Sequence, residues 1–440
     1  MTPVEPLDSR HGSIQGRPNN NMLEDMVVRC SLRGLTGAAT LGVLLTGAAL
    51  AQGAAPAAPP VDRGSALYGR PDGLEAAKLA PVSPPPLPTP LARLPIGKLH
   101  VPEGFKVEVY ASGVGNARSM RLGDQGTVFV GSRLLDKVYA VVPAASPGAP
   151  TTVKVIASGL HRPNGVAYHN GALYVAELSR IWRFDDIEAN LDHPPKPVLI
   201  YDDLPKDEAH GWKFIGIGPD NKLYVPIGSP GNILMPPATH AQIRRMDLDG
   251  TNVEMVATGV RNSVGFDWNP VTKDLYFTNN GRDWVSEDIP EDTLHRVSAT
   301  AETPPNFGFP YCHQGNFADP EYGWGHSCSE FAQPVALMGA HAAVLGMRFY
   351  TGDMFPSTYK NAIFMARHGS WNRTHKLGGD IVVVHLKEDG SVASVEPFMT
   401  GFLEDNKYNG RPVDVQMLKD GSLLVSDDWN GAIWRVSYAR

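Results

Sequence analysis

The sequence predicts an all-β fold, a six-bladed β-propeller. One short pattern, a glycine or polar turn followed by an apolar strand, recurs six times after about residue 100, at 126–130, 171–175, 221–225, 273–277, 360–364 and 421–425. Few stretches show a helical period, and the high content of glycine (45) and proline (38) is typical of many turns. A short antiparallel meander that is repeated six times closes most simply into a propeller.

The composition indicates one large folded body. Of the 440 residues, 42% are hydrophobic and 19% are charged, which excludes an extended or disordered chain. The 39 Lys and Arg residues are outnumbered by 46 Asp and Glu residues, for a net charge of −7. Because there is no basic surplus for a phosphate backbone, we expect no nucleic-acid partner.

The first 51 residues are predicted to be a signal peptide with an N-terminal extension. Arg29 and Arg33 precede an apolar stretch over residues 35–51 that ends in Ala49-Leu50-Ala51. Cleavage before Gln52 would give a periplasmic or secreted protein that is not integral to the membrane. An uncleaved anchor helix is the alternative.

Residues 52–96 are predicted to form a linker or a wrapped arm. They contain eleven prolines, including the run Pro84-Pro85-Pro86. Proline favours extended backbone and cannot pair inside a sheet, so the propeller domain is expected over residues 97–440.

Further strands are predicted on both sides of the repeated one. Apolar strands precede several copies, at 165–168, 214–217, 264–266 and 413–415, and others follow at 137–141, 180–184 and 432–436. The matching residues of successive copies are separated by 45, 50, 52, 88 and 60 residues. The long interval predicts an insertion between residues 297 and 350.

The insertion holds Cys312 and Cys328. In an exported protein an even pair of cysteines predicts a disulfide. A metal site with the neighbouring His313 and His326 is the alternative.

Polar residues mark the places where the inner strands are expected to begin. Arg118, Arg162, Arg261 and Arg411 are assigned to corresponding positions, together with His210. Loops at the inner strands of a propeller converge on its axis, and a ring of cations there would repel itself without an anion. The pattern therefore predicts a polyanionic ligand. The imidazole of His210 suits proton abstraction.

The segment from Asn279 to Asp292 contains a glycine and several carboxylates, which is the chemistry of a calcium site. A solvated acidic loop is the alternative.

The chain resembles the glucose/sorbosone dehydrogenase family, the soluble quinoproteins that carry pyrroloquinoline quinone (PQQ) and calcium in a six-bladed propeller. The matching stretches are HGWKFIGIGPDNKLYVPIG, GVRNSVGFDWNPVTKDLYFTNNGRD, NFGFPYCHQG, GMRFYTGDMFP, ARHGSWNR and GRPVDVQMLKDGSLLVSDDWNGAIWRV. They span residues 100–440 and look most like the sorbosone dehydrogenase branch. PQQ is a tricarboxylate and would supply the predicted anion.

The resemblance implies roles for several residues. It makes His210 the general base and places Arg261 and Asn262 near the reactive quinone carbonyl. It gives Arg411 and Arg373 to the cofactor, and calcium to the backbone carbonyls of Gly281 and Arg282. Together with the predicted cation ring, the expected cofactor-binding residues are Arg118, Arg162, Arg261, Asn262, Arg373 and Arg411, and His368 and Trp371 are candidates for the pocket wall.

The chain departs from the family pattern at three positions. Ala209 replaces an acidic residue before the base, with Glu208 as a candidate substitute, and Val413 replaces a second arginine on the last blade. The segment from Asp292 to His295 departs from the DELN that is common in the sorbosone branch.

The function predicted from these features is PQQ- and calcium-dependent oxidation of a sugar, an aldose or a sorbosone-like aldehyde. His210 would take the hydroxyl proton, and an external acceptor, a periplasmic carrier or a membrane quinone, would reoxidise the quinol. The alternatives are a calcium-dependent lactonase-type hydrolase and a non-catalytic binding propeller.

Overall fold

The computed structural model describes residues 65–146 and 149–439, and the chain divides into two units, Met1–Pro59 and Pro60–Arg440. The predicted signal peptide lies outside the described residues. In the part that the structure describes, no helix is long and apolar enough to cross a membrane.

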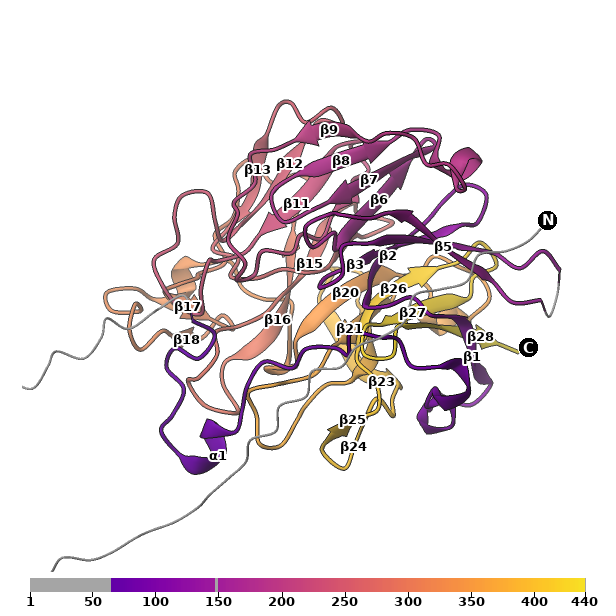
Figure 1. The fold of residues 1–440 in the computed structure, drawn as a ribbon. Coiled ribbons are helices and arrows are strands. Elements are labelled where there is room, and N and C mark those ends of the chain that lie inside the picture. The colour runs from indigo at the N-terminus through magenta and orange to yellow at the C-terminus, as the bar shows by residue number, and fades with distance from the viewer. Residues whose placement is uncertain (1–64, 147–148, 440) are drawn as a thin grey trace, which may run out of the picture. The chain divides into compact units, whose positions relative to one another are not determined.

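Six four-stranded antiparallel sheets form the six blades of a β-propeller, which confirms the predicted fold (Figure 1). The first three sheets contain β2 (Ala117–Leu122), β3 (Val128–Ser132), β4 (Val138–Val142) and β5 (Thr152–Ala157); β6 (Gly165–His169), β7 (Ala172–Ala176), β8 (Ile181–Phe184) and β9 (Val198–Tyr201); and β10 (Gly216–Ile217), β11 (Leu223–Ile227), β12 (Gln242–Met246) and β13 (Glu254–Thr258).

The last three sheets contain β14 (Phe266–Trp268), β15 (Leu275–Asn279), β16 (Glu291–Val297) and β19 (Ala336–Ala340); β20 (Val344–Phe349), β21 (Ile363–Arg367), β22 (Asp380–Leu386) and β23 (Val392–Met399); and β26 (Pro412–Met417), β27 (Leu423–Asp427), β28 (Ala432–Tyr438) and β1 (Phe105–Ser112). The six predicted repeats fall on the second strand of each sheet. Strands also lie before and after them as predicted, except that the strand predicted at 264–266 begins only at Phe266.

The propeller is closed by strands from both ends of the domain. β1 completes the last sheet by pairing with β28, from Phe105 opposite Tyr438 to Ser112 opposite Ala432. Closure of this kind leaves no gap between the first and last blades. The repeat pattern of the sequence did not predict it.

A hydrophobic cluster lies between every pair of neighbouring blades. Phe129 of the first blade packs with Leu173 of the second, for example, and Phe214 of the third packs with Phe266 of the fourth. The last cluster joins Val128 and Leu424 of the first and sixth blades. Apolar residues on both faces of the sheets, not one central core, therefore hold the blades together.

The insertion between β16 and β19 carries the short hairpin of β17 (Cys312–His313) and β18 (Phe317–Ala318) and the 3₁₀ helix η4 (Cys328–Glu330). Cys312 and Cys328 form a disulfide with their Cα atoms 5.5 Å apart, as predicted. His313 instead contacts Asp319 at 2.8 Å and His326 contacts Glu330 at 3.1 Å. The alternative of a metal site on the two cysteines is therefore wrong.

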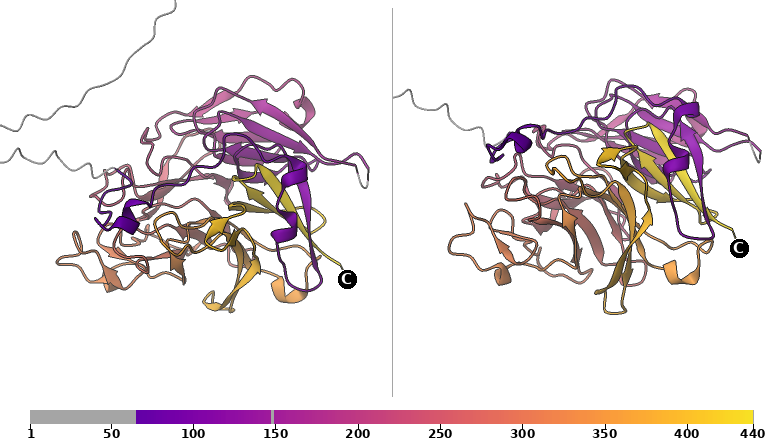
Figure 2. Two further views of the ribbon diagram at one scale, coloured as in Figure 1. Left: turned by 60° about the horizontal axis from the view of Figure 1, so that its bottom comes forward. Right: turned by 90° about the horizontal axis from the view of Figure 1, so that it is seen from below.

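The remaining elements are short. The arm carries α1 (Leu74–Ala77), η1 (Leu91–Arg93) and η2 (Ile96–Lys98), and η3 (Ile187–Asn190), η5 (Ser357–Tyr359) and the hairpin of β24 (Leu403–Glu404) and β25 (Lys407–Tyr408) lie in loops. Two further views show the dark indigo arm running from α1 to the sheet of β1 (Figure 2).

Candidate active site

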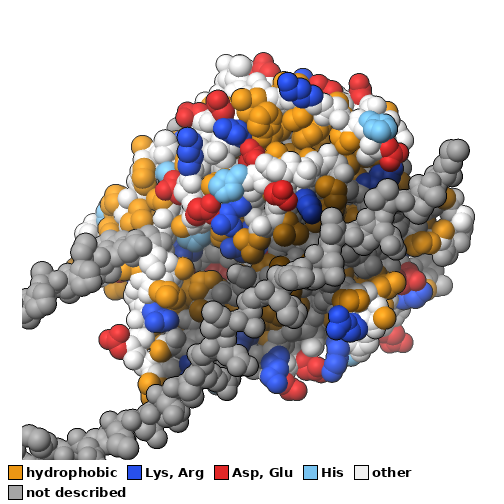
Figure 3. All heavy atoms as spheres, in the orientation of Figure 1, with side chains coloured by type: hydrophobic (Ala, Val, Ile, Leu, Met, Phe, Trp, Pro, Cys, Tyr) orange, Lys and Arg blue, Asp and Glu red, His pale blue; other side chains and the backbone are white. Residues whose placement is uncertain are grey.

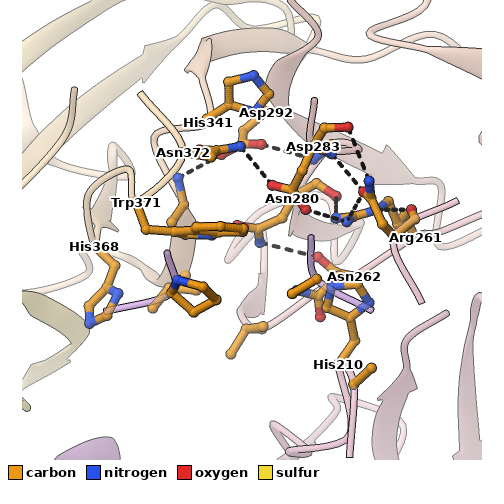
Figure 4. A pocket seen from close by; sticks show the side chains of 18 of the residues that line it. His210, Arg261, Asn262, Asn280, Asp283, Asp292, His341, His368, Trp371 and Asn372 are labelled. Carbon is orange, nitrogen blue, oxygen red and sulfur yellow. Dashed lines mark hydrogen bonds and ion pairs between the residues drawn. The ribbon is translucent and has the colours of Figure 1, made fainter. Parts of the chain in front are cut away.

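One pocket of about 280 Å³ collects residues from two kinds of loop (Figure 4). The first strands and the loops that enter them supply Arg118, His210, Arg261, Asn262 and Arg411. The loops that leave the second strands supply Arg133, Asn232, Gly281, His368 and Trp371. In an antiparallel blade both loops lie at the same end, which explains why these distant segments meet.

His210 presents the ring nitrogen that a general base needs. Its Nδ1 lies 2.8 Å from the carbonyl oxygen of Ser229, so Nδ1 donates a proton and Nε2 keeps its lone pair. Burial, and then the charge of Arg261, lower the pKa of His210 to about 3. The imidazole is therefore neutral in the ligand-free pocket. Its backbone has φ +49°, which is unusual outside glycine and is found at functional sites.

Glu208 does not orient His210. It contacts His161 at 3.0 Å and forms an ion pair with Arg162. The backbone carbonyl of Ser229 takes the orienting role that an acidic residue was expected to fill.

Arg261 is held in place by a network of buried and half-buried partners. Its Nε donates to the carbonyl of Asn232 at 2.8 Å, and its Nη2 donates to Oδ1 of Asn232 and to Oδ2 of Asp283, both at 2.9 Å. Asn372 donates to the other oxygen of Asp283 at 2.8 Å. Asn262 follows Arg261 on the pocket wall. The network fixes the guanidinium beside His210.

Arg118 and His368 share one buried carboxylate. Asp428 accepts from Arg118 at 2.9 Å and contacts Nε2 of His368 at 2.9 Å. Burial opposes ionisation of Asp428, but His368 and Arg118 lower its pKa overall. The positive charge of Arg118 is thus largely balanced within the protein.

Two other arginines have donors that are not matched by a carboxylate in the contacts described. Arg411 donates to the backbone carbonyls of His368, Gly369 and Val82, at 3.2, 2.6 and 3.1 Å. Arg133 stacks on Trp212, with its guanidinium carbon 3.7 Å from the ring centroid. Nε of Arg133 and Nε1 of Trp212 are buried without a hydrogen-bond partner among the described residues.

These donors give the pocket the chemistry of an anion site. Burial, and next the charge of Arg118, lower the pKa of Arg133 to about 9, so its cation lacks stabilisation in the ligand-free protein. A bound carboxylate would supply both the charge and the missing acceptors. The residues present therefore fit the predicted tricarboxylate PQQ. The surface drawn in Figure 3 instead mixes positive and negative side chains.

The predicted basic residues do not share one register. The strand pairings align Arg121, Ala167, Gly216, Asp267, Arg348 and Gln416, and three residues before these lie Arg118, Asn164, Lys213, Val264, Leu345 and Val413. Arg162 and Arg411 lie two positions earlier than this set. The assignment of the arginines to corresponding positions was therefore wrong, because bulges and loops of unequal length hide the register in the sequence.

The aligned set has a polar half and an apolar half, and Arg118, Val264 and Leu345 of this set line the pocket. Arg118 donates to Asn164 at 3.0 Å, and Asn164 donates to the carbonyl of Lys213 at 2.8 Å. Burial lowers the pKa of Lys213 to about 7. Val264, Leu345 and Val413 pack together, with Trp212 against them. Val413 therefore replaces the family's arginine inside a complete apolar cluster.

Three predicted site residues do not line the pocket. Arg162 forms its ion pair with Glu208, and Arg373 donates to the carbonyl of Glu287 and to Asp288. The side chain of Arg282 is buried against Asp319, at 2.6 Å, and Glu321. A role for Arg282 through its backbone carbonyl remains a prediction.

The region predicted to hold calcium does reach the pocket. Gly281, Asp283 and Asp292 line one wall. Asp292 accepts from the backbone N–H groups of Gly281, at 2.8 Å, and Ala343, at 2.7 Å, while burial raises its pKa to about 6. The described residues contain no group of three or more His, Cys, Asp or Glu residues that could hold a metal by side chains alone.

Sequence reasoning missed Arg133 and Asn232. The predicted ring of cations was taken from the loops before the first strands, whereas these two residues follow the second strands β3 and β11. The same rule of antiparallel geometry, applied to the predicted strand 126–130, would have pointed to Arg133. Trp212 lay within a matched motif but was not singled out.

A family model described as TrAA12-like matches residues 99–439. The chain belongs to the TrAA12-like family. An uncharacterized protein of Borreliella burgdorferi is 33% identical over 358 residues, covering 78% of this chain and 91% of the relative. A pyrroloquinoline quinone-dependent pyranose dehydrogenase of Coprinopsis cinerea is 24% identical over 411 residues. That match covers 78% of this chain and 55% of the relative, so the TrAA12-like chain spans about half of that protein's length.

Solved structures share the fold. The holo form of the PQQ domain of the Coprinopsis cinerea pyranose dehydrogenase has a TM-score of 0.66 and 20% identity, and the match covers 77% of this chain and 97% of that one. A calcium structure of the Trichoderma reesei family AA12 enzyme has a TM-score of 0.67 and 19% identity, with 82% and 99% covered. The predicted relationship to PQQ-dependent sugar dehydrogenases is confirmed, and this TrAA12-like chain is a member of an oxidoreductase family.

Proposed function

We propose that this protein is a PQQ- and calcium-dependent dehydrogenase that oxidises an aldose or a sorbosone-like aldehyde. The observation that carries the proposal is the pairing of a neutral His210, with Nε2 free, and a fixed Arg261 in a pocket with unmatched cationic donors. The names of the relatives supply the cofactor and the class of substrate. A periplasmic or secreted location and an external electron acceptor complete the proposal.

PQQ, when bound, would supply a two-electron oxidant that can accept a hydride, one proton with two electrons, from the carbon that carries the substrate hydroxyl. Nε2 of His210 accepts the proton of that hydroxyl. Arg261 and Asn262 present a fixed cation and an amide beside the base, where negative charge develops. Arg133 and Arg411 would hold the PQQ carboxylates, and Arg118 lines the same pocket.

Calcium is assigned to the wall of Gly281, through the carbonyls of Gly281 and Arg282. Asp283 and Asp292 place negative charge in this wall, which favours a cation. Their oxygens already accept from Arg261, Asn372 and two backbone N–H groups. The lactonase-type alternative requires free side-chain oxygens for its metal, so this arrangement favours the dehydrogenase.

Dye reduction by the protein reconstituted with PQQ tests the function. We expect oxidation of aldoses or sorbosone when Ca²⁺ is present, and loss of turnover after chelation. His210→Ala should lower kcat by about 10²- to 10⁴-fold, the range for loss of a general base, with PQQ affinity changed less than about threefold. His193→Ala, at an exposed histidine, is the matched control. Equal turnover by His210→Ala and the unaltered protein would contradict the proposal.

A further inference from the structure

The proline-rich arm forms one wall of the pocket. Ala66, Pro81 and Val82 line the same cavity as His210 and the arginines. The arm precedes the first strand, β1 (Phe105–Ser112), and belongs to none of the six sheets. It therefore contributes to the site from outside the repeated architecture, as the dark indigo trace in Figure 1 illustrates.

The arm is attached to the residues that hold the pocket's cations. The carbonyl of Val82 accepts from Nη1 of Arg411 at 3.1 Å. The carbonyl of Tyr68 accepts from Nδ2 of Asn232 at 3.1 Å, and Asn232 in turn fixes Arg261 through two hydrogen bonds. Arg411 and Arg261 thus each have a contact that leads to the arm.

Two further contacts fix the ends of this segment. Nε1 of Trp284 donates to the carbonyl of Ala66 at 2.8 Å, and Trp284 packs edge-on against Trp371 of the pocket wall, with ring centroids 5.2 Å apart. The backbone N–H of Thr89 donates to the carbonyl of Asn430 at 2.8 Å, and the Thr89 hydroxyl donates to Oδ1 of Asn430 at 2.9 Å. The arm between Ala66 and Thr89 is therefore held at both ends and touches the site between them.

We propose that residues 66–89 are part of the cofactor site, where Val82 positions Arg411 and Tyr68 positions Asn232, so that seating of the arm and binding of the anionic cofactor stabilise each other. The inference rests on the proposed function for the identity of the anion. A carbonyl that accepts from a guanidinium limits its rotation, and an ordered guanidinium binds a carboxylate better. Because coupling is reciprocal, a cofactor that needs the seated arm must also hold it in place.

Thiol labelling tests the contact between the arm and the cofactor. Val82 lines the pocket and is half-buried, whereas its neighbour Ser83 is exposed. Cys312 and Cys328 are bonded to each other, so a cysteine introduced on the arm can be followed directly in the cleaved protein. We expect PQQ with Ca²⁺ to slow labelling of Val82→Cys at least tenfold and that of the control Ser83→Cys less than twofold. Equal labelling of Val82→Cys with and without PQQ would overturn the inference.

Removal of the arm tests the coupling. A chain that starts at Leu87 keeps the Thr89–Asn430 pair and loses Ala66, Tyr68 and Val82. Quenching of tryptophan fluorescence, from Trp212 and Trp371 in the pocket, measures PQQ binding. We expect the Kd to rise at least tenfold, and an unchanged Kd would contradict the coupling. If the shortened chain does not fold, the labelling of Val82→Cys and Ser83→Cys in the cleaved protein that keeps the arm decides.

The two proposals fail in different ways. Protection of Val82→Cys by PQQ without any sugar oxidation would overturn the function and support the role of the arm. Sugar oxidation with unprotected Val82→Cys and an unchanged Kd would support the function and overturn the role of the arm.

Discussion

His295 shows what burial does to an imidazole that has no charged partner. It stacks against Phe277, and Phe307 packs on its edge, with ring centroids 5.2 and 4.6 Å apart. Burial lowers its pKa to about 3. His295 is therefore protonated below about pH 6.5 in the unfolded chain but only below about pH 3 in the folded chain. The free energy of unfolding is at its full value above pH 6.5 and decreases as the pH falls from 6.5 to 3.

We expect this single histidine to cost about 2 kcal/mol of stability at pH 5 relative to pH 8. In urea unfolding, His295→Leu should show a smaller drop between these pH values than the unaltered protein. His193→Leu, at an exposed histidine, should keep the full drop. The same drop in His295→Leu would show that His295 is not the group that titrates.

Among the pocket residues, Arg133 has the environment that most clearly favours binding of an anion. It lines the pocket, stacks on Trp212 and has a buried Nε without a partner among the described residues. Arg133→Gln should weaken PQQ binding about ten- to a hundredfold, the range for one charge-assisted hydrogen bond of about 1.5–3 kcal/mol. Arg93→Gln, on the exposed part of the arm, is the control. Unchanged affinity in Arg133→Gln would remove this residue from the site.

At the scale of the blades, the sequence could predict the site residues that lie next to strands but not the direction of side chains in the loops. The structure brings His210, Arg261, Asn262, Gly281 and Arg411 together in one pocket, and each of them lies in a matched motif close to a predicted strand. Arg162 and Arg373 fail because the direction of a loop side chain depends on neighbours such as Glu208 and Asp288, which no local pattern reveals. The register of the arginines was lost at bulges such as the one between Ala117 and Met120.

The apolar cluster of Val264, Leu345 and Val413 gives a reason for the departure at Val413. Val264 and Leu345 occupy the matching position in two other blades and pack against Val413. The surroundings of Val413 are therefore apolar. Restoring an arginine there would bury a charge without a partner and should lower stability by several kcal/mol.

We expect Val413→Arg to lose several kcal/mol in denaturant unfolding and to gain no affinity for PQQ. Val271→Arg, at a side chain that is 71% exposed, should change stability by less than about 0.5 kcal/mol. A stable Val413→Arg protein with tighter PQQ binding would show that position 413 is the missing cofactor contact and that the apolar packing of this cluster is dispensable.

For the molecule as a whole, the periodic pattern was enough to predict six blades, because each blade repeats the same short strand and turn. Closure by β1 and the seating of the arm depend on contacts between residues more than 300 positions apart, such as Val109 with Trp434 and Thr89 with Asn430. Such contacts leave no periodic trace in a single sequence. The disulfide was predictable because its two cysteines are the pair that remains after the signal region.

The central claim is that this pocket oxidises a sugar with bound PQQ. Its most direct test is the absorbance spectrum of the protein reconstituted with PQQ and Ca²⁺, recorded without oxygen before and after addition of an aldose or sorbosone. We predict conversion of the oxidised cofactor spectrum to the reduced one in the unaltered protein and no conversion on the same timescale in His210→Ala. A bound cofactor whose spectrum stays oxidised in the unaltered protein with every sugar tested would contradict the account.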